Sequence, residues 1–116
     1  MKQCNISLEQ RGNIDVIELD GSLDAYSFPR LESTIENLQK NDQHQVILDC
    51  GKLEYIGSAA LGTLVAFTRR IREHGGDMIL VHLSDKILNI VNLLGFDKIL
   101  TIHPDVSTAA EAFTGG

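Results

Sequence analysis

Apolar and polar residues alternate at the start of the chain. Cys4, Ile6 and Leu8 fall on one side of this segment with polar residues between them, and this period of two is typical of a strand. A turn signal at residues 11–13 leads into a second apolar run at residues 14–19. The pattern predicts an antiparallel hairpin with one face covered.

The period then lengthens to that of a helix. Leu31, Ile35 and Leu38 recur at i, i+4 and i+7, behind Ser27 as a candidate cap and Pro29 in the first turn. Similar spacing of apolar residues, with small residues where a helix would begin and glycine where it would end, predicts further helices over residues 58–73, 84–94 and 105–113.

Three short apolar runs separate these helices, at residues 46–50, 78–83 and 99–102. They lack alternation, as expected of strands buried on both faces. The order ββαβαβαβα predicts an α/β fold, with a mostly parallel mixed sheet, an antiparallel N-terminal edge strand and helices packed on it. A chain of 116 residues suits one core, so we expect a single domain over residues 1–116.

Composition excludes several classes of function. Ten Lys and Arg residues against sixteen Asp and Glu residues give a net charge of -6, which argues against nucleic-acid binding. The apolar runs are far shorter than the roughly 20 residues of a membrane span. The first residues contain no apolar signal region, so we expect a cytoplasmic protein.

Groups for catalysis or metal binding are scarce. Cys4 and Cys50 form no CxxC pair and are expected to be reduced core residues. The histidines show no metal-ligand spacing, so we expect no metal, cofactor or catalytic group; they are His44, His74, His82 and His103. One enzymatic alternative stays open, in which Asp49 at a strand end, or Cys50, is a phospho-acceptor.

The most informative stretch is residues 53–62. Gly57 permits an unusual backbone angle, and Ser58 then opens a helix among very small residues. Ser58 is interpreted either as a helix N-cap, worth about 1 kcal/mol, or as an accessible hydroxyl that a partner recognises. A role as helix cap explains the serine, but it does not explain why the residues around Ser58 are so small. Functional surfaces of such sheets lie where strands end, which also draws attention to residues 20–24.

These motifs together resemble the STAS domain, specifically the stand-alone anti-sigma factor antagonists, over nearly all of the chain. The family's first motif, a glycine followed by Leu-Asp, stands as Gly21-Ser22-Leu23-Asp24. Its second motif, an apolar strand ending in Asp that runs into aromatic-Ile-Asp-Ser-Ser-Gly-Leu-Gly, stands at residues 46–49 and 55–62. The chain departs from this motif where Gly57 replaces the family's Asp and where Ala60 replaces a glycine.

The resemblance implies a switch without catalysis of its own. Ser58 would be phosphorylated by an anti-sigma factor with serine kinase activity, beside Asp24. The unphosphorylated form would bind that kinase and release the sigma factor, and a PP2C-like serine phosphatase would restore it. The implied partner-binding residues are Gly21, Ser22, Leu23, Asp24, Tyr26, Gly57, Ser58, Ala59, Ala60, Leu61 and Gly62.

The same resemblance implies a bacterial regulator of transcription that is a monomer or weak dimer. The alternative within the family is a STAS subunit of another assembly, such as a lipid-transporter accessory protein or a stress-signalling scaffold.

Overall fold

The computed structural model describes residues 3–114, and the elements follow the predicted order. Their bounds are β1 (Asn5–Arg11), β2 (Ile14–Leu23), α1 (Phe28–Lys40), β3 (Gln45–Ile56), α2 (Ser58–Glu73), β4 (Asp77–Val81), α3 (Asp85–Leu93), a short 3-10 helix η1 (Phe96–Lys98), β5 (Thr101–His103) and α4 (Val106–Phe113). No helix in this part of the chain is long and apolar enough to cross a membrane.

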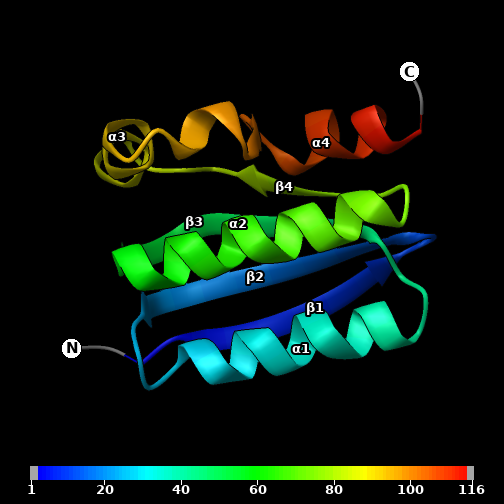
Figure 1. The fold of residues 1–116 in the computed structure, drawn as a ribbon, viewed down its shortest axis with the longest axis horizontal. Coiled ribbons are helices and arrows are strands. Elements are labelled where there is room, and N and C mark those ends of the chain that lie inside the picture. The colour runs from blue at the N-terminus through cyan, green and yellow to red at the C-terminus, as the bar shows by residue number, and fades with distance from the viewer. Residues whose placement is uncertain (1–2, 115–116) are drawn as a thin grey trace.

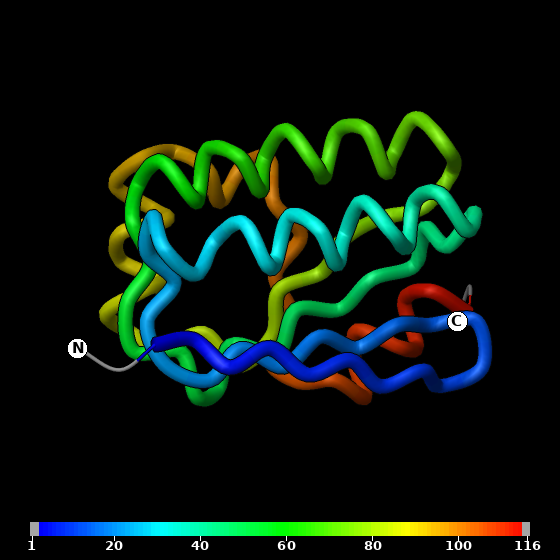
Figure 2. The backbone as a smooth tube through the Cα atoms, turned by 90° about the horizontal axis from the view of Figure 1, so that it is seen from below, coloured from blue at the N-terminus to red at the C-terminus, as the bar shows by residue number. Residues whose placement is uncertain are grey.

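The five strands form one mixed sheet in the order β1-β2-β3-β4-β5 (Figure 1). β1 pairs antiparallel with β2, and the remaining neighbours are parallel. Helices α1 and α2 lie on one face, and α4 lies on the other (Figure 2). The predicted mixed α/β sheet with an antiparallel edge strand is confirmed.

The larger core fills the space between the sheet and helices α1, α2 and α3. Leu31, Ile35 and Leu38 point into it, as the helical spacing predicts. Cys4 and Cys50 are also buried there as free thiols. A second, smaller cluster under α4 contains Val16, Ile47, Ile79, Val81 and Ala109.

β3 is longer than the apolar run predicts. It extends to Ile56 because its second half pairs with β2 as far as Leu23↔Ile56, past two register irregularities. Asp49 therefore lies within β3, and the expectation that it ends the strand is wrong.

Arg72 connects the last turn of α2 to two strands. Its Nε lies 3.0 Å from Asp77 Oδ1, and its terminal nitrogen donates to the Thr101 hydroxyl at 3.0 Å. Thr101 in turn donates to Asp77 Oδ2 at 2.7 Å. This network fixes the C-terminal end of α2 against β4 and β5.

We predict that Arg72→Ala lowers the free energy of unfolding by about 1 kcal/mol, because a charge-assisted network of this partly exposed kind is lost. Urea denaturation measures the loss. The control is Arg69→Ala, which removes an exposed arginine of the same helix. Equal losses in the two variants would contradict a specific role for Arg72.

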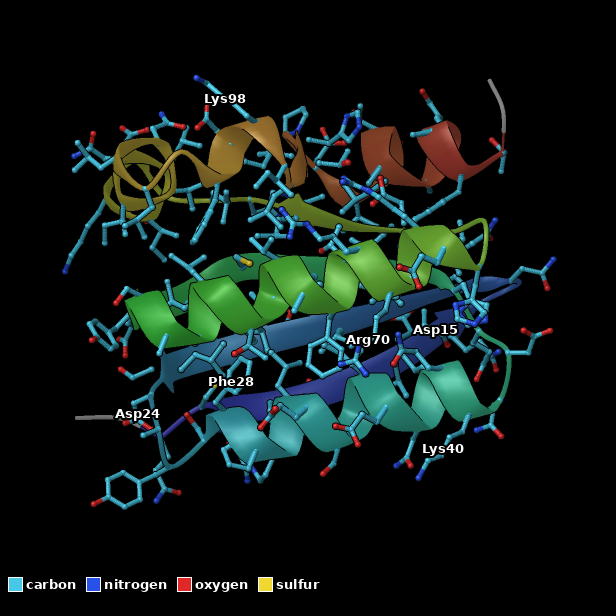
Figure 3. All side chains as sticks on the ribbon, viewed as in Figure 1. Asp15, Asp24, Phe28, Lys40, Arg70 and Lys98 are labelled. Atoms are coloured by element: carbon cyan, nitrogen blue, oxygen red, sulfur yellow. The ribbon has the colours of Figure 1, made fainter. Side chains whose placement is uncertain are left out.

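Asp15 is a buried carboxylate on β2. Asp15 lies on the same sheet face as Ile17, the face covered by α1 and α2. The residue is 1% exposed, and its Oδ2 has no hydrogen-bond partner among the described residues. Figure 3 places it toward the end of the molecule opposite Asp24. Burial raises the pKa of the Asp15 carboxyl above its ordinary value, because the charged form is desolvated.

This shift makes ionised Asp15 destabilising at neutral pH. The folded state holds the proton more tightly than the unfolded state, so this penalty disappears as pH falls through the raised pKa toward the ordinary value of 3.8. Asp15→Asn should therefore raise the free energy of unfolding at pH 7 by about 1 kcal/mol, and the gain should shrink toward pH 4. Urea denaturation at several pH values tests this, with exposed Asp97→Asn as control. A less stable Asn variant at pH 7 would disprove the penalty.

Candidate functional site

Two loops meet where β2 and β3 end. The strands are parallel neighbours whose last residues pair as Leu23↔Ile56, and the Gly57 N–H donates to the Leu23 carbonyl at 3.3 Å. The β2–α1 loop and the start of α2 therefore lie side by side (Figure 1). Asp24 and Ser58 line the same groove, which has a volume of about 420 Å3.

Ser58 is the first residue of α2, and its side chain is exposed. The N-cap is Gly57, with φ -75° and ψ 153°, and no side chain caps the helix. The interpretation of Ser58 as the cap is therefore wrong, and so is the expectation of an unusual backbone angle at Gly57. The hydroxyl of Ser58 is free to meet another molecule, and the N–H groups of the first turn have no side-chain acceptor.

Asp24 shapes the loop that faces Ser58. Its Oδ1 accepts hydrogen bonds from the backbone N–H groups of Tyr26 at 3.0 Å and Ser27 at 3.1 Å. The Ser27 hydroxyl accepts from the Asp24 N–H at 3.0 Å and donates to the Ser22 carbonyl at 2.8 Å. The hydrogen bond from the Ser27 N–H is the main reason that the pKa of the Asp24 carboxyl lies below its ordinary value. A fixed negative charge therefore lies in the groove.

Several of the expected partner-binding residues line this groove, namely Leu23, Asp24, Gly57, Ser58, Ala59 and Ala60. The other lining residues are absent from the expected partner-binding set. They come from the β2–α1 loop, the first turns of α1, the end of β3 and the second turn of α2, and they are Ala25, Phe28, Pro29, Glu32, Tyr55 and Thr63. Of these, Tyr55 lies in the stretch of residues 53–62 that the sequence analysis singled out. Phe28 and Glu32 follow Asp24 at intervals of four residues, which is the signal that could have identified them. Figure 3 shows Asp24 and Phe28 at the end of the molecule where α2 begins.

Other expected site residues are buried. Gly21, Ser22 and Leu61 have little or no exposed surface. Gly21 has φ 119°, and a Cβ there would clash with the Gln3 carbonyl oxygen, so glycine is required by the close approach of the chain ends of β1 and β2. These residues support the surface from beneath.

Exposed apolar side chains gather at the same end of the molecule. Tyr26, in the β2–α1 loop, is 90% exposed, and Tyr55, which lines the groove, is 42% exposed. Leu93 and Leu94, which sequence reasoning missed, are 78% and 43% exposed at the C-terminal end of α3. Figures 1 and 2 both show α3 at the end where α2 begins. Large exposed apolar residues mark surfaces that other proteins cover.

The enzymatic alternative finds no support in the geometry. Asp49 accepts from the Gly51 N–H and pairs with His82 at 2.9 Å, away from the groove. Burial raises the pKa of the Cys50 thiol to about 12, so it is not a thiolate nucleophile. His82 lies just beyond β4 with an exposed side chain. Residues 3–114 hold no cluster of three or more acidic, histidine or cysteine side chains that could bind a metal.

Comparisons with known proteins place this geometry in a family. The model of the STAS domain matches residues 5–109. The anti-sigma-B factor antagonist of Listeria monocytogenes is 26% identical over 102 residues, covering 84% of this chain and 89% of that protein. The antagonist of the same name from Bacillus subtilis is 26% identical over 99 residues, with coverages of 84% and 89%.

Solved structures share the fold. A putative anti-sigma factor antagonist from Thermotoga maritima superposes with a TM-score of 0.87 at 19% identity, and 94% of each chain is covered. The Bacillus cell fate determinant SpoIIAA in its phosphorylated form superposes with a TM-score of 0.73 at 17% identity, covering 93% of this chain and 99% of that one. The family model spans most of the sequence, and the chain belongs to the STAS domain family, as a distant homologue of the anti-sigma factor antagonists.

Proposed function

We propose that this protein is an anti-sigma factor antagonist controlled by phosphorylation of Ser58. The unphosphorylated form binds an anti-sigma factor with serine kinase activity, which releases the sigma factor. A PP2C-like serine phosphatase restores the binding form. The observation that carries this proposal is the exposed Ser58 hydroxyl at the uncapped start of α2, facing a groove that also contains Asp24.

A phosphate at Ser58 is compatible with the fold. It adds about −1.5 to −2 charges at the N-terminal end of α2, where the helix dipole favours an anion by roughly 0.3–1 kcal/mol. Because no side chain caps α2, the free N–H groups of the first turn are available to the phosphate oxygens. Phosphorylation therefore requires no refolding of the antagonist.

The same phosphate would oppose a bound partner. A kinase surface closing over Ala59 would have to desolvate the dianion near the ionised Asp24, and two anions close together in a dry interface repel. A penalty of about 3 kcal/mol lowers affinity on the order of a hundredfold. Local repulsion and desolvation are thus sufficient to switch the complex off.

The proposed contact surface centres on the groove. Tyr26, Ser58 and Ala59 are exposed and supply direct contacts, while Leu61 and Leu23 hold them in place from the core. Tyr55, which lines the groove, and Leu93, at the C-terminal end of α3, add exposed apolar area. In this proposal the protein acts in the cytoplasm as a monomer or weak dimer, and it contributes no catalytic group, since its partner supplies the chemistry.

The phosphorylation switch predicts distinct results for two Ser58 variants. Each anti-sigma factor with a serine kinase domain encoded in the same genome is purified and incubated with ATP and the protein. Intact-mass analysis should show one added phosphate on the wild type and none on Ser58→Ala. Ser58→Glu, which places a charge at the same point, should weaken kinase binding by about tenfold or more and leave the thermal midpoint nearly unchanged.

The matched control is Ser107→Glu, which places the same charge on an exposed serine of α4, on the opposite face of the sheet. It should bind the kinase as the wild type does. Equal binding by Ser58→Glu and Ser107→Glu would refute the switch, and an unfolded Ser58→Glu would show that Ser58 is chiefly structural. Capture of a transporter ATPase instead of a kinase from the native cell would favour the other-assembly alternative.

A further inference from the structure

Two histidines lie against each other at the end of the molecule opposite Ser58. His44 belongs to the connection from α1 to β3, and His74 is the C-cap of α2, in the connection to β4. Their imidazole rings stack, with centroids 4.6 Å apart and an interplanar angle of 17°. Figure 1 shows both connections at the end of the molecule opposite the start of α2. This stack, here called the histidine clasp, joins the segments that follow the two helices of the groove.

The backbone around the histidine clasp brings the two connections close together. A Cβ at Gly76 would overlap the His44 carbonyl oxygen, so the approach of the two connections requires glycine there. The Asp77 N–H donates to the same carbonyl at 3.0 Å. Asp42 has a φ of 59°, which is uncommon for a residue with a side chain, and its Oδ1 lies 2.9 Å from His44 Nε2. The chain therefore tolerates an unfavourable backbone angle at the residue whose carboxylate holds the imidazole.

The hydrogen bonds of the histidine clasp suit two neutral rings. His74 Nδ1 donates to the Arg70 carbonyl oxygen at 2.9 Å, and His44 Nε2 donates to the Asp42 carboxylate, so each ring needs one proton. His44 Nδ1 is buried and has no hydrogen-bond partner among the described residues. A proton on this nitrogen would create a buried donor without an acceptor, which costs the full desolvation penalty of the donor.

Charging both rings is therefore unfavourable, whereas charging one is not. The C-terminal end of α2 favours a cation at His74, so we expect His74 to take the first proton. Protonation of His44 then places two like charges in one stack and buries the Nδ1–H without an acceptor. Asp42 compensates this only weakly, because its side chain is 94% exposed and water screens its charge.

The other charged groups around the histidine clasp do not supply the compensation. Arg72 and Asp77 pair with each other, and the two hairpin residues that line the same cavity, Gln10 and Asn13, are uncharged. Asp15 lies on the same face of the sheet, but desolvation is the cause that raises the pKa of its carboxyl, with no contribution from the clasp. The remaining charged residues of the adjoining helix ends are Lys40 of α1 and Arg69, Arg70 and Glu73 of α2. These are mostly cations, so they add to the repulsion between two charged rings.

We propose that the histidine clasp is a pH-sensitive switch built into the fold. It holds the α1–β3 and α2–β4 connections together while at most one of its imidazoles is charged, and it opens when both are protonated. Histidine is the side chain that ordinarily changes its charge between about pH 5 and pH 8, so mild acidification is the signal. The switch acts at the end of the molecule away from Ser58 and does not depend on phosphorylation.

His44→Phe tests the switch, because phenylalanine keeps a flat ring for the stack and cannot be charged. Between pH 8 and pH 5, the unfolding equilibrium constant of the wild type, measured by urea denaturation, should rise about tenfold more than that of His44→Phe. The reason is that folded wild-type protein binds the second proton less readily than the unfolded chain does, so stability falls as pH falls. The hydrogen bond to Asp42 that the variant lacks is present in the wild type at both pH values and cancels in the comparison.

The matched control is His103→Phe, which removes a partly buried histidine of β5 that takes no part in the stack. Its unfolding equilibrium constant should depend on pH as that of the wild type does. An equal pH dependence in His44→Phe and the wild type would refute the switch.

An NMR titration of the unmodified protein tests the same proposal without a variant. The imidazole signals of His44 and His74 should show two separate protonation steps, and the ring-current shifts of the stack should disappear at the second step. A stack that persists after both rings are protonated would overturn the proposal, and so would uptake of both protons in a single step like that of His103.

Discussion

The long parallel pairing of β2 with β3 is the constraint on which the site depends. Backbone hydrogen bonds align the two strands as far as Leu23 and Ile56, so their C-terminal ends stop at the same edge of the sheet. The next residues of each strand lead into α1 and α2, and the groove forms where these helices begin. Residues more than thirty positions apart in the chain, Asp24 and Ser58, thereby become neighbours in a fixed arrangement.

The surface at this edge consists of a well-packed layer of buried residues and, above it, a helix N-terminus whose first N–H groups have no side-chain acceptor. Leu23, Ile56 and Leu61 are buried beneath it, and the Asp24 turn is held by two backbone N–H hydrogen bonds to its carboxylate oxygen. Above this layer, α2 begins without a side-chain cap. Added charge is therefore met by backbone dipoles and not by rearrangement of the core, which is the physical requirement for a switch that acts through its surface alone.

Periodicity was enough to predict the order of the elements and the full extent of α2, because an amphipathic helix shows its buried face in the sequence. It did not predict the second half of β3, which exists because β2 offers a partner at residues without apolar alternation. The small residues around Ser58 indicated an accessible hydroxyl, but Gly57 rather than Ser58 proved to be the cap. Phe28 and Glu32 were missed because the groove arises from the spacing of α1 and α2, which is a tertiary property.

The Arg72 network has a consequence for the kinetics of partner exchange. It anchors α2 at the end farthest from Ser58, to Asp77 and Thr101 on two strands. The C-terminal end of the helix is therefore fixed to the sheet. A partner that docks on the free end meets a surface that does not need to form first, and association proceeds without a slow opening step. In the proposed switch, a phosphate at Ser58 would then act at the contact itself, through the dissociation rate of the complex.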